Sequence, residues 1–507
     1  MYGKKSVIRW MSLSISSSIL SLLFVLFHDQ LQSYLQEQIQ SQMTLQPGTQ
    51  MLAHWTEPPL EPELYAYIYN ITNPKEFISG TDLKIKVSEI GPFVYRSRVS
   101  KNVTSHRPGS LTFTSSSFYT FVPEKSIVHH DDIKVTVPNL VILSALMKKE
   151  TRESIDFVKT NIIWSILTSI PSSSQEPFIS LTPNQYLWGY EEDLACIDAL
   201  EQEDEHEMLF RSASSIVRPK SRFWDPETET CKFGIISQNN NTVSKEVTVD
   251  SGSSSPYSKC KVEVEENRFK GRKSLPPDTY DPSCPPSPSS NPLQKFGLMI
   301  DFFCGDIRME ADSELSGETQ ENASLIKRER YVPSNDSFKD LIPLESCFEG
   351  VPFYISQPHF YGSSFRYQDQ IEGIEEGQKD RHGLFMDLEK TYGGILGLQM
   401  RFQLNFKLIR DSAFEIISHL GQEETVLPLI WLQEGYKSLP TLQIVSLHVG
   451  LYMPSVLPKG MAFIFGLLSI IFSCILLHQF RTYPDIKKNV EEFECRYAYI
   501  SDAQKYI

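Results

Sequence analysis

Two uncharged apolar runs, one near each end of the chain, constrain the fold more than any other feature. The first extends from Trp10 to Phe27 and the second from Gly460 to Leu477. Each matches the roughly 18–20 residues that a helix needs to cross the hydrocarbon layer of a membrane. Basic residues flank the terminal side of both runs: Lys4, Lys5, Arg9, Arg481, Lys487 and Lys488. Because basic residues favour the cytosolic side, both ends are predicted in the cytosol and residues 28–459 outside it.

This topology divides the chain into five segments. They are a cytoplasmic N-terminus (1–9), a transmembrane helix (10–27), an extracellular or lumenal domain (28–459), a second transmembrane helix (460–478) and a cytoplasmic tail (479–507). A cleaved signal peptide is the alternative interpretation of the first run, since basic residues before an apolar stretch also describe one. No small-x-small cleavage site follows Phe27, which favours the membrane anchor.

The residues between the runs have the composition of a glycosylated protein in an oxidising compartment. Asn-x-Ser/Thr tripeptides predict five glycan acceptors, namely Asn70, Asn102, Asn240, Asn322 and Asn335. An even number of cysteines lies in the same region: Cys196, Cys231, Cys260, Cys284, Cys304 and Cys347. Pairing of such a set is expected outside the cytosol. The net charge of −15 argues against nucleic acid as a partner, because phosphate backbones are held by an excess of lysine and arginine.

The patterns along the soluble part predict an α+β fold. Residues 29–42 have leucine or isoleucine at four-residue steps, which indicates an amphipathic helix continuing out of the first span. Residues 65–137 read as strands separated by turns, one of them at Gly91-Pro92. Residues 139–170 lack glycine and proline and indicate a long helix or helical hairpin. Strands resume after residue 295, and the alternation in 398–409 predicts a long strand with one face in solvent.

Residues 196–295 carry the weakest pattern in the chain. They contain the acidic run 201–207, a serine-rich stretch and a proline-serine loop. The histidine in the acidic run, His206, raises a metal-binding hypothesis, but a solvated charged face is the favoured interpretation.

Several strings occur in a characteristic order. The first half contains LQPGT at 45–49 with Trp55 after it, NPKEF at 73–77 and EIGPFVYR at 89–96. The second half contains CFEGVPFYISQPHF at 347–360 and LPLIWL at 427–432. Between these two strings lie His382, Asp387, Gly393, Gln399, Arg401, Gln403 and Asn405. The ordered set resembles the class B scavenger receptor family, of the fatty-acid translocase, lysosomal integral membrane protein and sensory neuron membrane protein type, and the chain reads as a divergent member.

The resemblance implies a large ectodomain with an antiparallel β-barrel-like core, a helical cap and an internal hydrophobic tunnel. It implies that lipids, fatty acids, sterols or lipoproteins bind and that hydrophobic cargo passes to the membrane. Cys304 and Cys347 match one family disulfide, whereas the partner of Cys284 is left open among three other cysteines. The family's lysine-bearing cap loop has no lysine here. Substitute cations on the cap helix are Lys148, Lys149, Arg152 and Lys159, for which a solvated helix face is the favoured interpretation.

An enzyme and a trafficking receptor are the alternatives to a lipid receptor. No nucleophile elbow, zinc helix or phosphate-binding glycine loop is present, so no enzyme activity and no cofactor are expected. His359 and His382 are the candidate bases of a hydrolase, but a structural hydrogen-bonded role is favoured for both. A trafficking receptor for a protein partner is the alternative within the binding class. Two tail motifs, Tyr483 to Ile486 and Tyr497 to Ile500, fit the pattern that sorting adaptors bind in extended form. The plasma membrane is the expected location, with an endosomal or lysosomal membrane as the alternative, and a homo-oligomer is compatible with either.

Overall fold

The structure of the chain is a computed structural model. It describes residues 2–42, 44–58, 61–147, 176–192, 224–225, 228, 230–237, 240–241, 243, 246–251, 262–265, 328–331, 338–345, 348, 350–389, 395–411, 414–420 and 422–503. Two compact units divide the chain. The helical unit comprises residues 1–43 and 441–507, and the sheet unit comprises residues 44–440.

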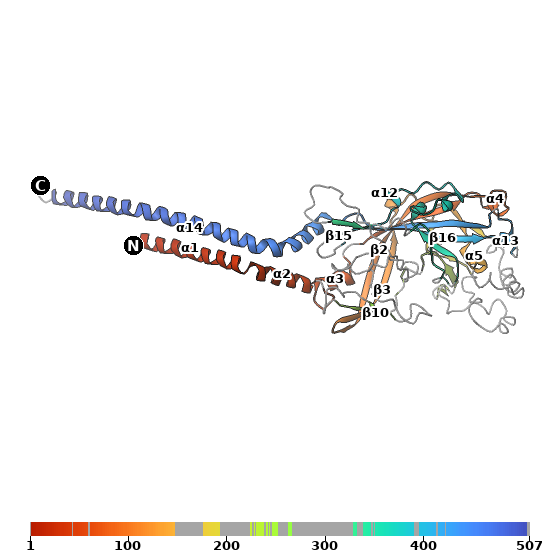
Figure 1. Cartoon of the computed structure of the whole chain (residues 1–507), viewed down its shortest axis with the longest axis horizontal. Coiled ribbons are helices and arrows are strands. Elements are labelled where there is room, and N and C mark those ends of the chain that lie inside the picture. The colour runs from red at the N-terminus through yellow and green to blue at the C-terminus, as the bar shows by residue number, and fades with distance from the viewer. Residues whose placement is uncertain are drawn as a thin grey trace. The chain divides into compact units, whose positions relative to one another are not determined.

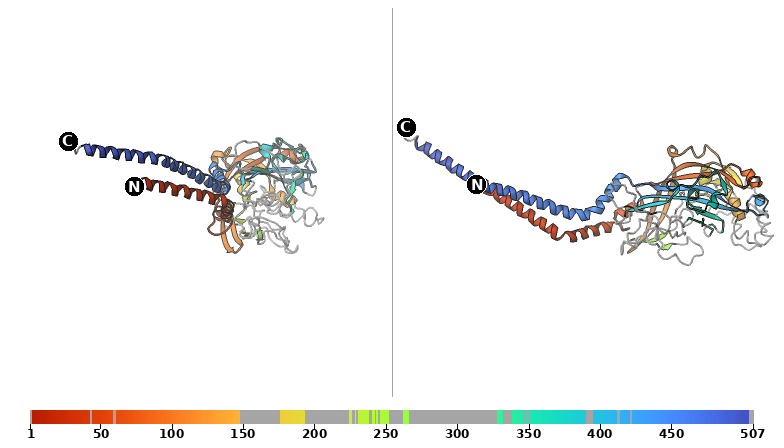
Figure 2. Two further views of the ribbon diagram at one scale, coloured as in Figure 1. Left: turned by 60° about the vertical axis from the view of Figure 1, so that its left-hand side comes forward. Right: turned by 45° about the horizontal axis from the view of Figure 1, so that its top comes forward.

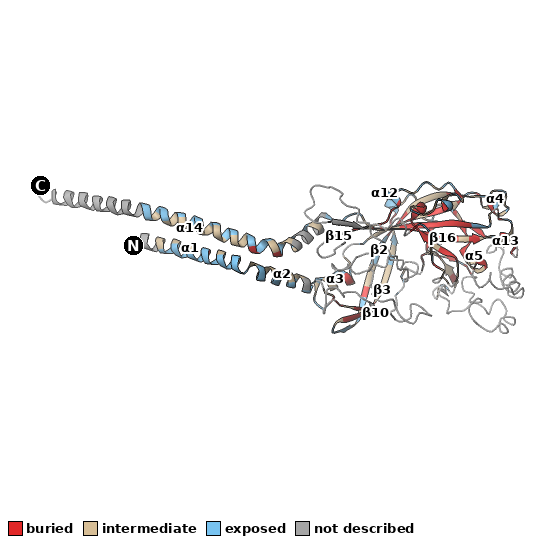
Figure 3. Ribbon diagram, viewed as in Figure 1, coloured by how far each residue is buried: buried red, intermediate tan, exposed pale blue. Residues whose placement is uncertain are grey.

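The helical unit consists of α1 (Tyr2–Leu26), α2 (His28–Gln42) and α14 (Thr441–Ala503). Helix α2 confirms the amphipathic helix predicted beyond the first span. Helices α1 and α14 lie side by side and run in opposite directions, so that both chain termini lie at the same end of this unit (Figures 1 and 2). Ser6–Leu26 and Tyr452–Arg481 are each long and apolar enough to cross a membrane. Their outer faces expose large apolar side chains, such as Leu22 at 58% and Phe463 at 71% exposure, as expected of surfaces that meet lipid (Figure 3).

Serines of the first span line its contact with α14. Ser14 Oγ lies 2.7 Å from Ser473 Oγ, and Ser18 Oγ lies 2.5 Å from Ser469 Oγ. One turn further along, Ser21 donates a hydrogen bond to a carbonyl of α14 over 2.8 Å. Small polar side chains let two helices approach closely and hydrogen-bond within a bilayer. The serine content that weakens the apolar signal of the first run therefore contributes to the packing of the helix pair.

The sheet unit is built on a twelve-stranded sheet with the strand order β10-β9-β3-β2-β1-β17-β16-β13-β12. Strand β15 pairs with β16, β11 pairs with β15, and the short β14 pairs in parallel with β2. The bounds are β1 Glu63–Ile71, β2 Ile85–Arg107, β3 Ser110–Phe121, β9 Val247–Asp250, β10 Val262–Glu265, β11 Arg328–Tyr331, β12 Ile342–Pro343, β13 Phe353–Ser356, β14 Ile371–Glu372, β15 Phe385–Glu389, β16 Ile395–Ile409 and β17 Glu424–Tyr436. The expected α+β class with a large antiparallel sheet is confirmed. Among the described residues the pairings leave the sheet open between β10 and β12, so closure into a barrel stays a prediction.

Smaller elements surround this sheet. A two-stranded sheet pairs β4 (Val135–Pro138) with β5 (Phe178–Leu181). In a three-stranded sheet, β8 (Thr230–Phe233) lies between β6 (Tyr190–Glu191) and β7 (Trp224–Asp225) and pairs with both. The short helices are α3 (Gln50–Thr56), α4 (Pro74–Ile78), α5 (Leu140–Met147), α8 (Pro183–Trp188), α11 (Phe365–Gln368), α12 (Lys379–His382) and α13 (Glu415–Ser418), with 3-10 turns η1 (Pro123–Lys125) and η7 (Pro358–Phe360). Helix α5 confirms the start of the helix predicted from residue 139, and its predicted continuation over 148–170 lies outside the described residues.

The string LQPGT with its following tryptophan fixes the start of the sheet unit. Thr49 caps α3 by accepting a hydrogen bond from the Leu52 amide over 3.2 Å. Leu45 and Trp55 are buried in a small core with residues of β3 and β9. Lys101 of β2 donates to the Trp55 carbonyl over 3.1 Å, and its ammonium lies 5.0 Å from the centre of the indole ring.

The predicted turn at Gly91-Pro92 is wrong, because β2 runs through both residues without a break. The register between β1 and β2 shifts at this point, which leaves Tyr67 unpaired in that ladder. A proline has no amide proton to give to a ladder and is tolerated at such an irregularity. Gly91 has a φ of +155° there, and a Cβ on it would lie 2.8 Å from the Tyr67 ring. The glycine is therefore required by close packing within a strand.

The prediction of a half-exposed strand over residues 398–409 is also wrong. Strand β16 is buried on both faces (Figure 3). Its polar residues are as inaccessible as its apolar ones: Gln399 and Arg401 are 3% exposed, and Gln403 and Asn405 are 0% exposed. Alternation predicted which residues share a face, but the polar face is covered by protein rather than by water.

The serine contact gives a test of the helix pair. Cysteines placed at Ser14 and Ser473, with Cys474 and Cys495 changed to alanine, are expected to form a disulfide on mild oxidation, because the two hydroxyls are in hydrogen-bond contact. The joined peptides would be detected by mass spectrometry of the full-length protein in membranes. A control pairing Ser14→Cys with Ile470→Cys, at an exposed position of α14, should not cross-link. Equal yields from both pairs would contradict the packing.

Candidate functional site

Two histidines separated in sequence stack in the interior of the sheet unit. His359 lies in η7 and His382 ends α12, and their ring centroids are 4.1 Å apart with an angle of 13° between the planes. They are 3% and 0% exposed. Both rings meet Trp431 of β17 at nearly perpendicular angles, and Trp431 stacks on Tyr67 of β1 at 3.8 Å. Two strings of the second half, through His359 and Trp431, therefore meet next to Tyr67 of the first half.

His359 and Glu89 are joined by a short hydrogen bond. The Nδ1 atom of His359 lies 2.9 Å from the Glu375 carbonyl oxygen, which only accepts, so Nδ1 carries a hydrogen. The Nε2 atom lies 2.5 Å from Oε2 of Glu89, a contact that needs a second hydrogen between the two atoms. Trp431 donates its indole N–H to the same carboxylate oxygen over 2.8 Å. Burial by itself raises the pKa of Glu89, but these donors and the charges of His359 and Arg381 hold the pKa below its usual value.

The polar face of β16 supports this pair. Gln403 accepts hydrogen bonds from the Tyr69 hydroxyl and from the His359 amide, each over 2.8 Å. It donates in turn to Asn405, which donates to Ser356 over 3.0 Å. The polar side chains of β16 thus provide hydrogen-bond partners for one another, and Gln403 also positions η7. Buried polar groups are stabilising only when they are satisfied in this way.

Arg401 of the same strand supports the segment that bears His382. Its guanidinium donates to the carbonyls of Asp380 and Gly383, over 3.0 and 2.7 Å, and to the side chains of Gln433 and Gln399. The four contacts use the fixed fork geometry of arginine, which lysine lacks. Arg401 therefore fixes the position of α12 against the sheet.

His382 is a neutral histidine at physiological pH. Burial, with the charges of His359 and Arg381 nearby, lowers its pKa to about 4. Its Nδ1 accepts a hydrogen bond from the Gln378 amide over 2.9 Å, which assigns the hydrogen to Nε2. Within the described residues Nε2 has no hydrogen-bond partner. Both histidines are thus buried and hydrogen-bonded within the protein, and a structural role for them stays a prediction.

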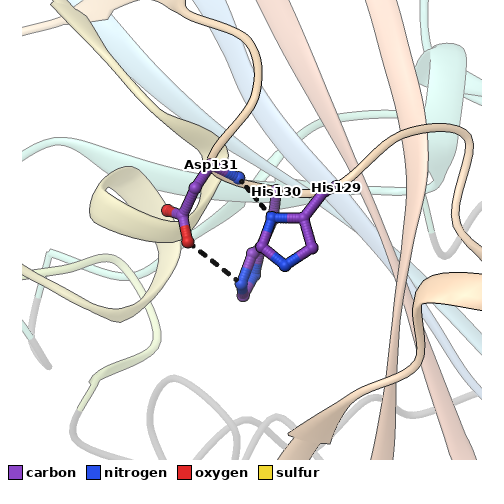
Figure 4. A group of neighbouring side chains, drawn as sticks. All are labelled: His129, His130 and Asp131. Atoms are coloured by element: carbon purple, nitrogen blue, oxygen red, sulfur yellow. Dashed lines mark hydrogen bonds and ion pairs between the residues drawn. The ribbon is translucent and has the colours of Figure 1, made fainter.

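A second cluster lies at the surface, in the loop between η1 and β4 (Figure 4). His129, His130 and Asp131 are consecutive, and one possible metal-ligand atom from each lies within 4.8 Å of the others. The string His-His-Asp is the sequence signal for this cluster, which is not among the sites predicted above. Burial is the main cause that lowers the pKa of His130.

Most of the residues singled out from the sequence lie outside the described residues. These are the cap cations Lys148, Lys149, Arg152 and Lys159, the glycan acceptors Asn322 and Asn335, His206 of the acidic run, and Cys196, Cys260, Cys284, Cys304 and Cys347. Cys231 is buried in β8 and forms a disulfide bond whose partner lies outside the described residues. The pairing of Cys304 with Cys347 stays a prediction. The two tail motifs lie within α14, so binding in extended form would require the helix to unwind there.

The three described glycan acceptors differ in their surroundings. Asn102 is exposed on β2. The Asn70 amide is used inside the sheet unit, since its oxygen accepts from the Thr136 amide over 2.7 Å and its nitrogen donates to Ser88 over 3.3 Å. Asn240 accepts a hydrogen bond from the Tyr119 amide over 3.1 Å. The structure therefore favours Asn102 over Asn70 as an acceptor.

The pKa of His382 predicts a loss of stability in acid. The unfolded histidine binds a proton below about pH 6.5, whereas the folded one resists protonation down to about pH 4. Its contribution is therefore complete above pH 6.5 and decreases as the pH falls to 4, by up to roughly 3 kcal/mol. Thermal unfolding midpoints at pH 7.5, 6, 5 and 4 should decrease less for His382→Gln than for the wild type. His106→Gln, at an exposed position of β2, is the control, and equal slopes for H382Q and the wild type would contradict the assignment.

The glycan assignment is tested by single substitutions. Asn102→Gln should increase electrophoretic mobility by the equivalent of one glycan, since its side chain is free to carry the sugar. Asn70→Gln should leave mobility unchanged, because a modified Asn70 would lose the contacts that hold β1 to its neighbours. Enzymatic removal of all glycans should make both variants migrate with the wild type. A shift for N70Q alone would reverse the assignment.

Comparison with known sequences agrees with the strings that meet at the histidine pair. A sequence model of the CD36 family matches residues 13–294 and 308–480. Scavenger receptor class B member 1 of Bos taurus is 24% identical over 479 residues, which cover 89% of this chain and 85% of that protein. Lysosome membrane protein 2 of Homo sapiens is 23% identical over 415 residues, or 80% of each chain, and sensory neuron membrane protein 1 of Apis mellifera is 23% identical over 424 residues, or 79% and 78%. The class B scavenger receptor resemblance is confirmed, and the chain belongs to the CD36 family.

Proposed function

We propose that this protein is a two-pass membrane receptor that binds lipids or lipoprotein-type ligands and passes hydrophobic cargo to the membrane. The observation that carries the proposal is the family match over nearly the whole chain, combined with an apolar helix at each end of it. Relatives named scavenger receptor class B member 1 support a receptor role. In this proposal residues 28–459 face the exterior or the lumen, both termini are cytoplasmic, and no reaction is catalysed.

The anchoring supports transfer on physical grounds. Moving a fatty acid or sterol from an apolar environment into water costs about 0.8 kcal/mol of free energy for each methylene group. A carrier that keeps cargo in an apolar channel up to the bilayer avoids this cost, and a carrier fixed in the bilayer at both ends stays next to its acceptor. The plasma membrane is the proposed location.

Uptake by cells tests this proposal. Cells that express the full-length protein should take up labelled fatty acid, cholesteryl ester or lipoprotein faster than cells that lack it, at matched surface amounts of an epitope-tagged chain. A variant with Lys148, Lys149, Arg152 and Lys159 changed to alanine separates capture of acidic ligands from transfer. If these cations only solvate a helix face, the variant should match the wild type. No difference between expressing and control cells for any of the three ligands would remove the transport claim.

A trafficking receptor for a protein partner is the second candidate. It is supported by the two tyrosine motifs of the tail and by the relative named lysosome membrane protein 2. Sorting adaptors bind such motifs as extended segments. Under this candidate Tyr497→Ala would move the protein from endosomes to the cell surface, measured by surface biotinylation. Tyr499→Ala, within the same helix but not at the first position of the motif, is the matched control. An unchanged distribution of Y497A would exclude this signal.

A further inference from the structure

Three neighbouring side chains near the N-terminal end of α8, two imidazoles and one carboxylate, each bring a possible ligand atom within 4.8 Å of the others (Figure 4). Histidine nitrogen and carboxylate oxygen are ligands that Zn²⁺ and related transition metal ions bind, whereas Ca²⁺ and Mg²⁺ prefer oxygen alone. We propose that His129, His130 and Asp131 form a binding site for one divalent transition metal ion of the Zn²⁺ class. Solvent or a donor from another molecule would complete the coordination.

His130 is held in place before any ion binds. Its ring stacks on Phe121 with centroids 3.8 Å apart and planes within 10° of each other. The Tyr95 hydroxyl lies 3.0 Å from its Nδ1. If Nδ1 donates to this hydroxyl, the lone pair is on Nε2, which lies 3.5 Å from Oδ2 of Asp131. A hydrogen bond to the remote ring nitrogen is how metal-bound histidines are usually oriented.

Asp131 is oriented by the start of α8. Thr182 donates to its Oδ1 over 3.3 Å and Asn184 donates to its Oδ2 over 3.4 Å. The backbone N–H of Asn184 also donates to the backbone carbonyl of His130 over 3.2 Å, and this bond fixes the backbone of the same loop. Thr182 is itself fixed as the cap of α8 by a reciprocal pair of hydrogen bonds with Gln185. Neutral donors of this kind orient a carboxylate but do not neutralise it.

The electrostatic surroundings of Asp131 favour a bound cation. Among the described residues no lysine or arginine forms an ion pair with this carboxylate, and its one ion-pair contact is His130. Asp132, the next residue, adds a second exposed negative charge. A bound divalent ion would offset the negative charge of these two carboxylates.

Binding requires a small movement of exposed groups. Ligands of a tetrahedral Zn²⁺ lie about 3.4 Å apart at bond lengths of about 2.0–2.1 Å, so the present spread of up to 4.8 Å has to close. His129 is the group that would move, since its ring is exposed. The Asp131 amide donates to Nδ1 of His129 over a long 3.3 Å, and this weak bond is the one that turning the ring would break.

The test measures Zn²⁺ itself on the full-length protein, purified in detergent without a polyhistidine tag. Isothermal titration at pH 7.5 should find one equivalent more Zn²⁺ bound by the wild type than by the double variant His129→Gln, Asp131→Asn. Each single variant should weaken that equivalent by tenfold or more. Both changed side chains are solvent-exposed, so the variants should fold, and thermal unfolding without metal checks this. His106→Gln is the matched control, because it removes one exposed imidazole elsewhere.

Co²⁺ gives a second readout that does not depend on the number of equivalents bound. Visible absorption bands of tetrahedral or five-coordinate Co²⁺ should appear with the wild type and with H106Q, and should be lost with the double variant. Equal Zn²⁺ stoichiometry and affinity in the wild type and the double variant would overturn the proposal. Absence of saturable Zn²⁺ binding to the wild type would overturn it as well.

Discussion

The contact between Glu89 and His359 joins β2 to η7 across 270 residues of sequence, and the arrangement of the interior depends on it. His359 has a φ of +55° and Phe360 a φ of +53°, left-handed values that cost a residue other than glycine on the order of 1–3 kcal/mol. Hydrogen bonds compensate at every polar atom of His359: its amide, its carbonyl and both ring nitrogens have partners. The turn keeps this conformation because any other backbone conformation would break these hydrogen bonds.

Beyond that pair, most of the strings that identify the family have structural roles. LQPGT and Trp55 fix the first helix of the sheet unit to the sheet, Gly91 permits β2 to pass closely over Tyr67, and Trp431 carries hydrogen bonds and ring contacts to both halves. Each of these residues makes contacts that a different side chain would not reproduce. The loop with His129 and His130 lies outside all of these strings.

Both units provide protein hydrogen-bond partners for polar side chains at their packing contacts. In the sheet unit, β16 buries four polar side chains by pairing them with one another and with backbone carbonyls. In the helical unit, the serines of α1 meet serines and carbonyls of α14, while leucine, isoleucine and phenylalanine face outward. Water is excluded from the interior of the sheet unit, and it would be excluded from the helix pair within a membrane, so polar groups in both places need protein partners.

The sequence by itself determined the two apolar spans, the α+β class, most strand positions and the family, because hydropathy, alternation and ordered strings are local properties of the chain. It also determined that Gln399, Arg401, Gln403 and Asn405 share one face of a strand. Only the tertiary structure decided that this face is buried, that β2 continues through Gly91 and Pro92, and that Glu89 reaches His359. Burial and hydrogen-bond partners come from segments hundreds of residues away, and a pattern of period two contains no information about them. The cluster of His129, His130 and Asp131 was readable as letters, but its orientation by Tyr95, Thr182 and Asn184 exists only in the folded chain.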